Sequence, residues 1–367
     1  MTGRTLGVVT ASYPRFAGDP AGNFVAAHVA ALRALGHRVD VIAAGEAGAA
    51  RGAPLDEPVQ RIASSRLFYR GGAPDALERS PLGAGLAAAV FTARMTARVT
   101  ARAGRWDTII AHWLVPSALA ALPAGRPLVA IAHGGDVFTL RRLHLLRPVL
   151  GALERRGAQL VFVSEALRTI ARAAVPALAR WIEAARVQPM GIDLARFARL
   201  PRAPSDPPVV LVVARLVPIK GVDVAIAAMR YVRAPARLVI AGDGPERARL
   251  VAHDRASFLG EVTTTRRDEL LAAASAVVVP SRVLGDGRTE GTPAIALEAL
   301  AAGVPVIASS VGGLRELPGI QHVPPDDPRA LARAIDHTLA GAPSAVELRA
   351  GVASLDWREV AQRLLRQ

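Results

Sequence analysis

The chain has 367 residues, room for about two domains, and a formal net charge of +14. It contains no cysteine, which excludes disulfides, zinc–thiolate sites, iron–sulfur clusters and a cysteine nucleophile. Hydrophobic residues form 51% of it, enough for a core, but no clean apolar run is long enough to span a membrane. The first residues are too weakly apolar for a signal peptide. We therefore expect a soluble bacterial protein of the cytoplasm.

The basic residues are unusual in kind and in place. Lys220 is the only lysine among 45 basic residues, so this position has kept a lysine in a chain that otherwise uses arginine. Residues 1–200 hold 25 arginines against 13 acidic residues, whereas residues 201–367 are nearly balanced. The clustered arginines of the first half are Arg94, Arg98, Arg102, Arg105, Arg141, Arg142, Arg147, Arg155 and Arg156. They fit a solvated face, an anionic membrane surface or, less well, nucleic acid.

The first half alternates short apolar runs with helical periodicity. Leu6–Thr10 is predicted to be a strand, Asn23–Leu35 a helix that ends at Gly36, and Val39–Ala43 the next strand. This order forms a βαβ unit, which implies a parallel sheet. Further strands are predicted at Thr108–Ala111, Leu128–Ala132 and Leu160–Val163.

A proline-rich stretch at residues 200–208 precedes a second alternation. Its predicted elements are the strands Val209–Ala214, Arg237–Ala241, Ala276–Pro280 and Val304–Ala308 and the helix Val222–Met229. We therefore predict an α/β protein with two doubly wound domains, residues 1–200 and 201–352, and a terminal segment, residues 353–367. Ligands bind such sheets at the carboxyl ends of strands, and the cleft between two domains is the expected site.

One helix start in the second half has the features of an anion site. Thr292 is a good N-cap and Pro293 a good first helical residue. The amides of Ala294 and Ile295 are then left to bind an anion such as phosphate. An ordinary capped helix is the alternative.

Two glutamates flank this helix start. Glu290 lies in the loop before it and Glu298 lies inside the helix. Because a carboxylate accepts hydrogen bonds from vicinal hydroxyls, the pair suggests a ligand with sugar hydroxyls on both sides of a phosphate. Two surface glutamates without a ligand are the alternative.

Three further strand ends carry candidate residues. Arg215 and Lys220 follow the strand that begins at Val209, and both can direct a cation at one anion. The turn Gly242–Pro245 lets a ligand approach the backbone, or is a simple turn. His133 follows Leu128–Ala132 and can donate to a sugar hydroxyl, and His112 follows another strand in the same way. A structural loop histidine is the alternative for both, and no nucleophile triad, P-loop or metal-ligand cluster is recognisable.

Taken in order, these segments resemble glycosyltransferase family 4, whose retaining enzymes have the GT-B fold of two facing Rossmann-like domains with an interdomain cleft. Glu290 and Glu298, with seven residues between them, resemble its paired-glutamate motif. The other similar segments extend over nearly the whole chain and are His28, Leu35–Val39, His133–Asp136, Val163–Leu167, Pro189–Asp193, Ala214–Arg215, Lys220–Gly221, Gly242–Pro245, Phe258–Gly260, Ala302–Ile307 and Val311–Gly313.

The resemblance implies a role for each catalytic candidate. Arg215 and Lys220 would hold the donor diphosphate and stabilise the departing nucleotide. Glu298 would bind the ribose and Glu290 the transferred sugar, and His133 would lie beside that sugar at the reacting carbon. The other donor-binding residues implied are Gly22, Gly242, Gly260, Val262, Gly291, Thr292, Pro293, Ala294 and Ile295.

The resemblance also implies partners and cofactors. The donor is a nucleotide-sugar, the acceptor is a glycan or lipid-linked glycan, and no metal or other cofactor is required because cationic side chains replace magnesium. A basic first domain suits docking on an anionic membrane, so a peripheral position on the inner face of the plasma membrane is expected and nucleic acid is not. Two departures are the loop around Gly22, where the family often has adjacent glycines, and Met190, where many members have asparagine.

Alternatives from the same fold and from another class stay open. A sugar phosphorylase or a nucleotide-sugar epimerase can share the GT-B fold, although Lys220 leaves no lysine for a pyridoxal-phosphate site. A nucleic-acid-binding protein would need aromatic side chains for stacking, and aromatic residues are only 4% of the chain. The terminal segment is amphipathic, and Trp357, Val360 and Leu364 are expected to pack on the first domain.

Overall fold

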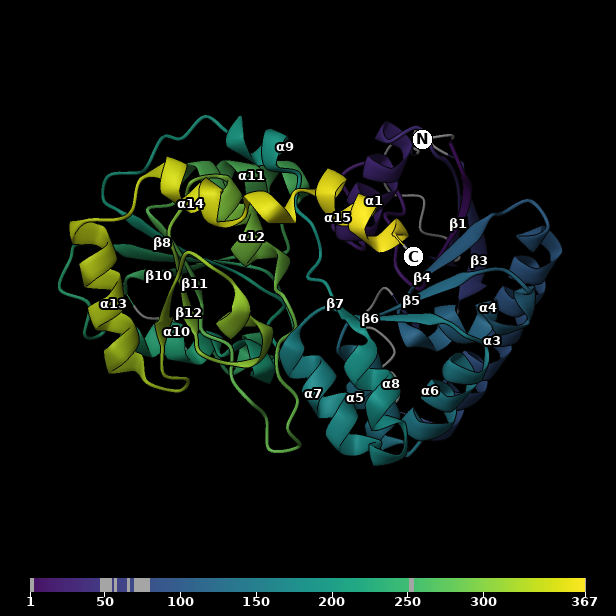
Figure 1. Ribbon diagram of the computed structural model, residues 1–367. Helices are drawn as coiled ribbons and strands as arrows, with labels where there is room; N and C mark the ends of the chain where they lie inside the picture. Colours follow the sequence, from purple (N-terminus) through teal and green to yellow (C-terminus); the bar gives the residue numbers. More distant parts are fainter. Residues whose placement is uncertain are drawn as a thin grey trace. The chain divides into compact units, whose positions relative to one another are not determined.

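The computed structural model describes residues 3–46, 55, 58–64, 67–68, 80–250 and 254–366 (Figure 1). The chain divides into two compact units. Unit 1 comprises Met1–Gly191 and Trp357–Gln367, and unit 2 comprises Ile192–Asp356. Each unit has a parallel sheet of its own. The predicted α/β class with doubly wound parallel sheets is therefore confirmed.

Unit 1 is built on a seven-stranded sheet in the order β3-β2-β1-β4-β5-β6-β7, and every pairing in it is parallel. β4 (Thr108–His112) and β5 (Leu128–Ala132) are buried at every residue. Such continuous burial is typical of a parallel sheet with helices on both faces. The other strands are β1 (Thr5–Thr10), β2 (Arg38–Glu46), β3 (Val59–Ser64), β6 (Gln159–Phe162) and β7 (Arg186–Val187).

The helices of unit 1 come from both ends of the chain. They are α1 (Asn23–Ala34), α3 (Pro81–Ala103), α4 (Leu119–Ala121), α5 (Gly135–Arg142), α6 (Leu146–Arg155), α7 (Glu165–Ala174), α8 (Ala179–Ala184) and α15 (Trp357–Leu365). α15 is the last helix of the chain and packs against α1 (Figure 1). Its residues Trp357, Val360 and Leu364 are buried in the core of unit 1.

Unit 2 is built on a six-stranded parallel sheet in the order β10-β9-β8-β11-β12-β13. Its strands are β8 (Val209–Val213), β9 (Arg237–Ala241), β10 (Ala256–Gly260), β11 (Ala276–Val279), β12 (Val306–Ser309) and β13 (Ile320–Val323). Its helices are α9 (Leu194–Ala198), α10 (Val222–Ala228), α11 (Thr264–Ala273), α12 (Ala294–Ala301), α13 (Pro328–Ala340) and α14 (Ala345–Gly351). Every strand predicted for this half is present, with ends that differ by at most two residues.

The boundaries between the units differ from the expected ones. Unit 1 ends at Gly191, and the proline-rich stretch expected to be the linker lies within unit 2. Arg202 holds this stretch in place, because its guanidinium donates to the carbonyl oxygens of Leu271 (2.7 Å) and Ala274 (2.8 Å) at the end of α11. Residues 353–356 also belong to unit 2, so the terminal segment of unit 1 begins at Trp357.

Candidate active site

Both sheets carry their candidate residues at the carboxyl ends of parallel strands. In unit 1, His112 is the last residue of β4 and His133 follows β5 directly. In unit 2, Arg215 comes shortly after β8 and Gly242 follows β9 directly. Ligands bind open α/β sheets at this edge. The topology therefore gathers the candidates of each unit at one edge of its own sheet.

One buried carboxylate holds the loop that carries His133. Asp136 Oδ1 accepts hydrogen bonds from the backbone N–H groups of His133 (3.1 Å), Gly134 (2.9 Å) and Val137 (3.0 Å). Its Oδ2 accepts a fourth from the N–H of Leu114 (2.7 Å), just after β4. Burial raises the pKa of Asp136, and the four amide donors oppose that rise. The main chain of His133 is thus fixed relative to two strand ends.

Two further histidines lie next to His133. His112 Nδ1 is 3.0 Å from His133 Nε2, and His28 Nδ1 is 3.1 Å from His112 Nε2. The rings of Phe24 and Trp113 pack against His133 with centres 5.2 and 4.8 Å away. Sequence reasoning treats His112 as a separate candidate and His28 as part of a helix, and it misses their link to His133. The available signal is that two neighbouring strands both end in histidine.

Lys220 and Glu290 form an ion pair in unit 2. Lys220 Nζ lies 2.6 Å from Glu290 Oε1, and Ser281 Oγ donates to the same oxygen at 3.3 Å. Gly221, next to the lysine, has a φ of +59°, and a Cβ there would lie 2.0 Å from the carbonyl oxygen of Pro280. Only glycine therefore lets the loop after β8 approach the loop after β11 so closely. This approach brings together two of the predicted catalytic residues.

The loop that carries Arg215 is joined to the turn after β9. The N–H of Leu216 donates to the carbonyl oxygen of Asp243 at 2.9 Å. Gly242 has a φ of +136°, and a Cβ there would lie 1.9 Å from the carbonyl oxygen of Ala214. This glycine is therefore required by a neighbouring backbone, whatever the loop binds. Burial lowers the pKa of Arg215.

The helix after Glu290 begins later than predicted. α12 spans Ala294–Ala301, and Pro293 is its N-cap with φ −63° and ψ 122°. Thr292 is therefore not the N-cap and Pro293 is not the first helical residue, because the proline keeps an extended ψ and helical dihedrals begin only at Ala294. The amides of Ala294 and Ile295 now belong to the first two helical residues. Amides at these positions have no intrahelical acceptor.

Glu298 has a different partner from Glu290. Its side chain is 11% exposed, and Oε1 lies 2.8 Å from Arg267 Nη1 of α11. Burial raises the pKa of Glu298, and the guanidinium of Arg267 opposes that rise. Sequence reasoning misses Arg267, because no motif distinguishes it from the other arginines of the chain.

The remaining predicted donor-binding residues lie near the same strand ends. Gly22 precedes α1 with a φ of +66°, and a Cβ there would lie 2.4 Å from the carbonyl oxygen of Ser12. Gly260 ends β10, and its carbonyl oxygen accepts from the N–H of Gly242 at 2.7 Å. Val262 is partly buried against the core of unit 2, and Gly291 lies in the loop before α12. Their role in donor binding stays a prediction.

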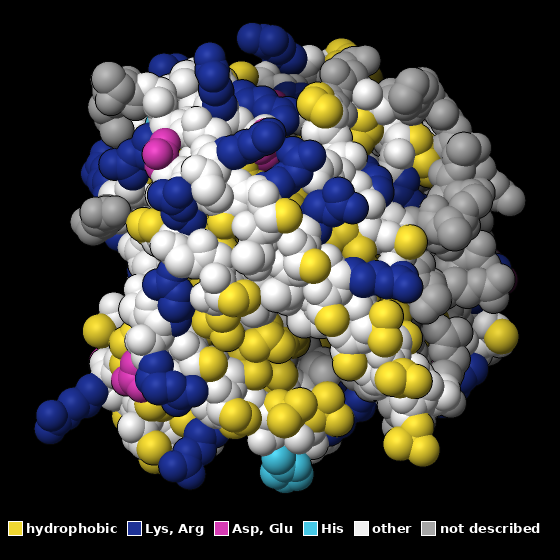
Figure 2. Space-filling view, turned by 90° about the vertical axis from the view of Figure 1, so that its right-hand side faces the viewer, with side chains coloured by type: hydrophobic (Ala, Val, Ile, Leu, Met, Phe, Trp, Pro, Cys, Tyr) yellow, Lys and Arg dark blue, Asp and Glu magenta, His cyan; other side chains and the backbone are white. Residues whose placement is uncertain are grey.

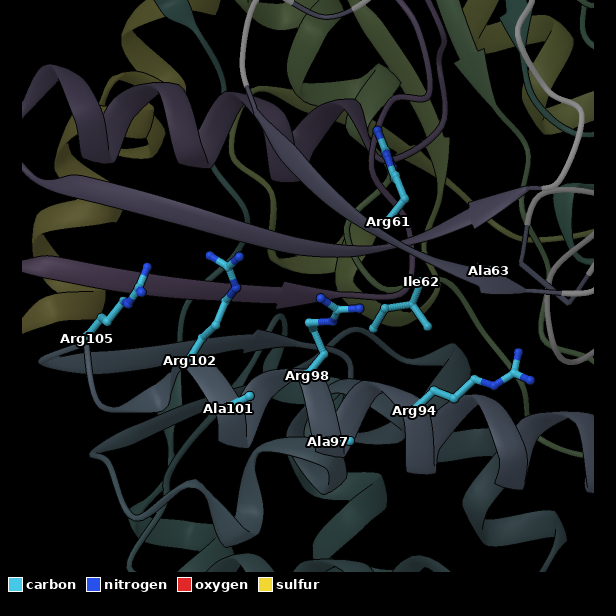
Figure 3. A pocket seen from close by; sticks show the side chains of 9 residues that line it. All are labelled: Arg61, Ile62, Ala63, Arg94, Ala97, Arg98, Ala101, Arg102 and Arg105. Carbon is cyan, nitrogen blue, oxygen red and sulfur yellow. The ribbon is translucent and has the colours of Figure 1, made fainter.

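Arginines line a hollow of about 700 Å³ between α3 and β3 (Figure 3). The lining arginines are Arg94, Arg98 and Arg102 of α3, Arg105 just beyond the end of that helix, and Arg61 of β3. Positions spaced by three and four residues share one face of a helix, so the α3 arginines form a single basic face. Figure 2 shows a side of the molecule on which basic side chains far outnumber acidic ones.

The described residues contain neither a metal-binding cluster nor a membrane-spanning helix. No three His, Asp or Glu side chains in that part of the chain come together as a metal site. No helix within the same residues is long and apolar enough to cross a membrane.

Comparisons with known proteins find matches in both halves. Residues 21–196 match the family described as Glycosyltransferase Family 4, and residues 207–341 match the family described as Glycosyl transferases group 1. A glycogen synthase of Mycobacterium tuberculosis (strain CDC 1551 / Oshkosh) is 32% identical over 303 residues, which cover 71% of this chain and 68% of that protein.

Two other similar proteins are a mannosyltransferase and a protein whose structure contains a nucleotide. A GDP-mannose-dependent alpha-(1-6)-phosphatidylinositol monomannoside mannosyltransferase of the same strain is 34% identical over 238 residues, 59% of this chain and 60% of that protein. The chain thus spans about three fifths of this relative's length. The structure of HepE from Anabaena in complex with UDP and glucose matches with a TM-score of 0.69 and 21% identity, over 98% of each chain. At that identity the likeness shows the fold alone, which is GT-B.

Proposed function

The chain belongs to glycosyltransferase family 4, and we propose that it is a retaining hexosyltransferase. It moves a sugar from a nucleotide-sugar to a glycan or lipid-linked acceptor in cell-envelope or exopolysaccharide synthesis. The observation that carries this proposal is the Lys220–Glu290 pair in the loops that precede α10 and α12. The names of the relatives support both kinds of acceptor, a polysaccharide for one and a phosphatidylinositol mannoside for the other.

Lys220 suits a leaving diphosphate even while it is paired. An ammonium group has three N–H donors, so the bond to Glu290 leaves two for phosphate oxygens. Arg215 adds a planar guanidinium, and the N-terminus of α12 adds free amides and the positive end of the helix dipole. These groups supply the positive charge that a magnesium ion would otherwise bring, so transfer proceeds without a metal.

The proposed reaction is a same-face substitution at the anomeric carbon. The bond between that carbon and the diphosphate oxygen breaks, and Lys220 and Arg215 stabilise the charge that develops on the oxygen. The acceptor hydroxyl attacks from the side that the leaving group vacates, and its proton passes to a phosphate oxygen. Glu290 contacts the transferred sugar and Glu298 the ribose, so neither takes the role of a hydrolase carboxylate.

The acceptor proposal extends to the membrane surface. Three apolar residues on the N-terminal half of α3 face solvent, with Leu82 91%, Leu86 69% and Val90 44% exposed. The basic face of α3 follows directly along the helix. Among the described residues no acidic side chain forms an ion pair with its arginines Arg94, Arg98 and Arg102, or with Arg105 beyond the helix end. Exposed apolar residues beside arginines are typical of a helix that lies on anionic lipid.

Sedimentation with phosphatidylglycerol-containing vesicles tests the membrane part of the proposal. The variant Arg94→Ser/Arg98→Ser/Arg102→Ser is expected to lose binding. A control variant with the same charge change, Arg142→Ser/Arg147→Ser/Arg155→Ser, replaces exposed arginines of α5 and α6 and is expected to keep vesicle binding. Equal loss in both variants, or no binding by the native protein, would contradict the proposal.

A panel of nucleotide-sugars tests the enzymatic part. Thermal unfolding is measured with UDP-, GDP- and ADP-sugars, because a ligand that binds the folded state raises its stability by mass action. One nucleotide class is expected to raise the midpoint by several degrees, and its sugar is expected to appear on an acceptor glycan. Tight, salt-sensitive binding of DNA without any effect of nucleotide-sugars would overturn the proposal.

A further inference from the structure

Three histidines of unit 1 form one hydrogen-bonded row. His28 lies on the buried face of α1, His112 ends β4 and His133 follows β5. The nitrogen–nitrogen distances are 3.1 Å between His28 and His112 and 3.0 Å between His112 and His133, both within the hydrogen-bond range. Both ring nitrogens of His112 are used, so the three rings are linked end to end.

Aromatic rings hold this row from several sides. His28 is stacked on Trp357 with ring centres 4.9 Å apart and planes 10° apart. His112 and His133 are themselves nearly parallel, and the ring of Phe24 packs against both. His28 and His112 are fully buried, whereas His133 is only partly buried. The row therefore has a closed end at His28 and an open end at His133.

The rings are neutral at physiological pH. Burial lowers the pKa of His28 and of His133 to about 3, and it lowers the pKa of His112 well below the usual value. A neutral imidazole has one N–H donor and one acceptor nitrogen. His112 must then donate at one nitrogen and accept at the other, so the row has only two possible directions.

The closed end distinguishes the two directions. His28 Nε2 is buried and has no hydrogen-bond partner among the described residues. Because Trp357 is stacked parallel to the ring, an N–H in the plane of His28 cannot point at the indole face. If the row runs from His133 to His28, Nε2 carries an unpaired N–H, whereas the reverse direction leaves only a lone pair there. Buried N–H groups without an acceptor are the rarer case in proteins.

We propose that His28 and His112 are positioning residues that hold the ring of His133 in one orientation with its proton on Nδ1. His28 Nδ1–H donates to His112 Nε2, and His112 Nδ1–H donates to His133 Nε2. The nitrogen of His133 that remains for a ligand is then a fixed N–H donor. This inference rests on the proposed function, in which His133 lies beside the donor sugar.

The closed end also decides what the row does. A proton relay needs an exit, and in the described part of the chain no group lies within hydrogen-bond distance of the buried His28 Nε2 to receive or supply a proton. The row therefore fixes a tautomer and does not carry protons between the site and solvent. His133 acts as a hydrogen-bond donor to an oxygen of the sugar and not as a general base.

Nitrogen NMR of the full chain labelled with ¹⁵N-histidine tests the proposal without any substrate. Long-range proton–nitrogen spectra distinguish the two neutral tautomers, and His133→Gln identifies the signals of His133. We expect the Nδ1–H tautomer for His133 at neutral pH. A wild-type spectrum with the proton on Nε2, or on both nitrogens, would overturn the proposal.

Two substitutions at the closed end test the coupling. His28→Asn keeps a donor close to the position of Nδ1 and is expected to preserve the His133 signals. His28→Leu removes the donor and is expected to give a mixture of tautomers at His133. His144→Gln, at an exposed histidine, is the control. Unchanged His133 signals in a folded His28→Leu protein would contradict the coupling.

Kinetics separate positioning from mere stability. Once a donor is known, His28→Leu is expected to lower kcat about tenfold, a cost typical of losing an outer hydrogen-bond partner, with a smaller change in the donor KM. His28→Asn is expected to restore most of kcat, and equal losses in both variants would count against positioning. If no nucleotide-sugar reacts but the spectra are as expected, the proposed function fails and the tautomer assignment stands.

Discussion

At the scale of single residues, the Lys220–Glu290 pair contributes to both stability and function. The lysine side chain is 25% exposed and the glutamate side chain 12% exposed in this pair, so removing the lysine leaves a mostly buried carboxylate without its cation, at a cost of about 1–3 kcal/mol in stability. Lys220→Ala is expected to lower kcat for transfer by about 10²–10³-fold, the usual cost of removing one group that stabilises developing charge. The thermal midpoint is expected to fall by several degrees, so transfer is assayed well below the midpoint of the variant. The measurement is initial transfer rate with the donor that stabilises the protein.

Arg266→Ala is the matched control for this variant, because it breaks the exposed Arg266–Glu269 pair of 2.7 Å elsewhere in unit 2. It is expected to leave both transfer and stability unchanged. Full turnover by Lys220→Ala would remove the lysine from the mechanism.

The buried histidines predict how stability depends on pH. The unfolded chain protonates its histidines near pH 6.5, whereas His28 and His133 in the folded state have a pKa of about 3. The free energy of unfolding therefore has its full value, as far as these histidines affect it, above pH 6.5. It decreases as the pH falls toward 3, by about 1.4 kcal/mol per pH unit for each histidine. Urea unfolding at pH 7.5 and 5.5 measures this slope.

His28→Asn is expected to reduce the dependence of the unfolding free energy on pH by the contribution of one histidine. His144→Gln is expected to leave this pH dependence unchanged. The same slope in His28→Asn and the native protein would show that His28 does not titrate on unfolding in this range.

At the scale of elements, the start of α1 depends on a glycine. Gly22 has a φ of +66°, and a Cβ there would lie 2.4 Å from the carbonyl oxygen of Ser12. Gly18, in the same loop, has a φ of +85° but no atom within 4 Å of its Cβ position. Gly22→Ala is expected to cost more than Gly18→Ala, which costs about 1 kcal/mol from backbone strain alone. Equilibrium unfolding of the two variants gives the difference, and equal costs would show that the loop can move away.

The central strands could be predicted because their sequences are continuous apolar runs bounded by turn residues. Leu128–Ala132 and Arg237–Ala241 have the predicted ends, since apart from the exposed Arg237 their residues are all apolar. β3 and β7 at the edges of the unit 1 sheet were not predicted, because Arg61 and Arg186 interrupt their apolar pattern. Periodicity alone does not distinguish such short edge strands from loops.

The candidate site could be predicted less completely than the strands. The sequence indicates which residues follow strand ends, and the structure brings Lys220 to Glu290. The sequence could not indicate that His28 contacts His112, because that contact depends on how α1 lies across the sheet. Nor could it place Thr292, since Pro293 delayed the helix start by keeping an extended ψ. The packing of α1 on the sheet determines the histidine contact, and the backbone dihedrals of Pro293 determine where α12 begins.

At the scale of the whole molecule, the last helix of the chain belongs to the core of unit 1. Leu364 of α15 is fully buried there, whereas its neighbour Leu365 is only partly buried. Leu364→Ala is expected to lower the stability of unit 1 by about 2–4 kcal/mol, and Leu365→Ala by much less. Hydrogen exchange of β1 and β4 reports on unit 1 directly. Equal effects of the two substitutions would show that α15 does not contribute to that core.

The most direct test of the central claim is the anomeric configuration of the product formed without a metal. Transfer is run in EDTA with the nucleotide-sugar that stabilises the protein, and NMR determines the anomeric configuration of the new glycosidic bond, which as an acetal does not mutarotate. We predict the same anomeric configuration as in the donor, at a rate that added Mg²⁺ does not raise, because Arg215 and Lys220 stabilise the leaving diphosphate. An inverted product, or a reaction that stops in EDTA and resumes with Mg²⁺, would contradict the account.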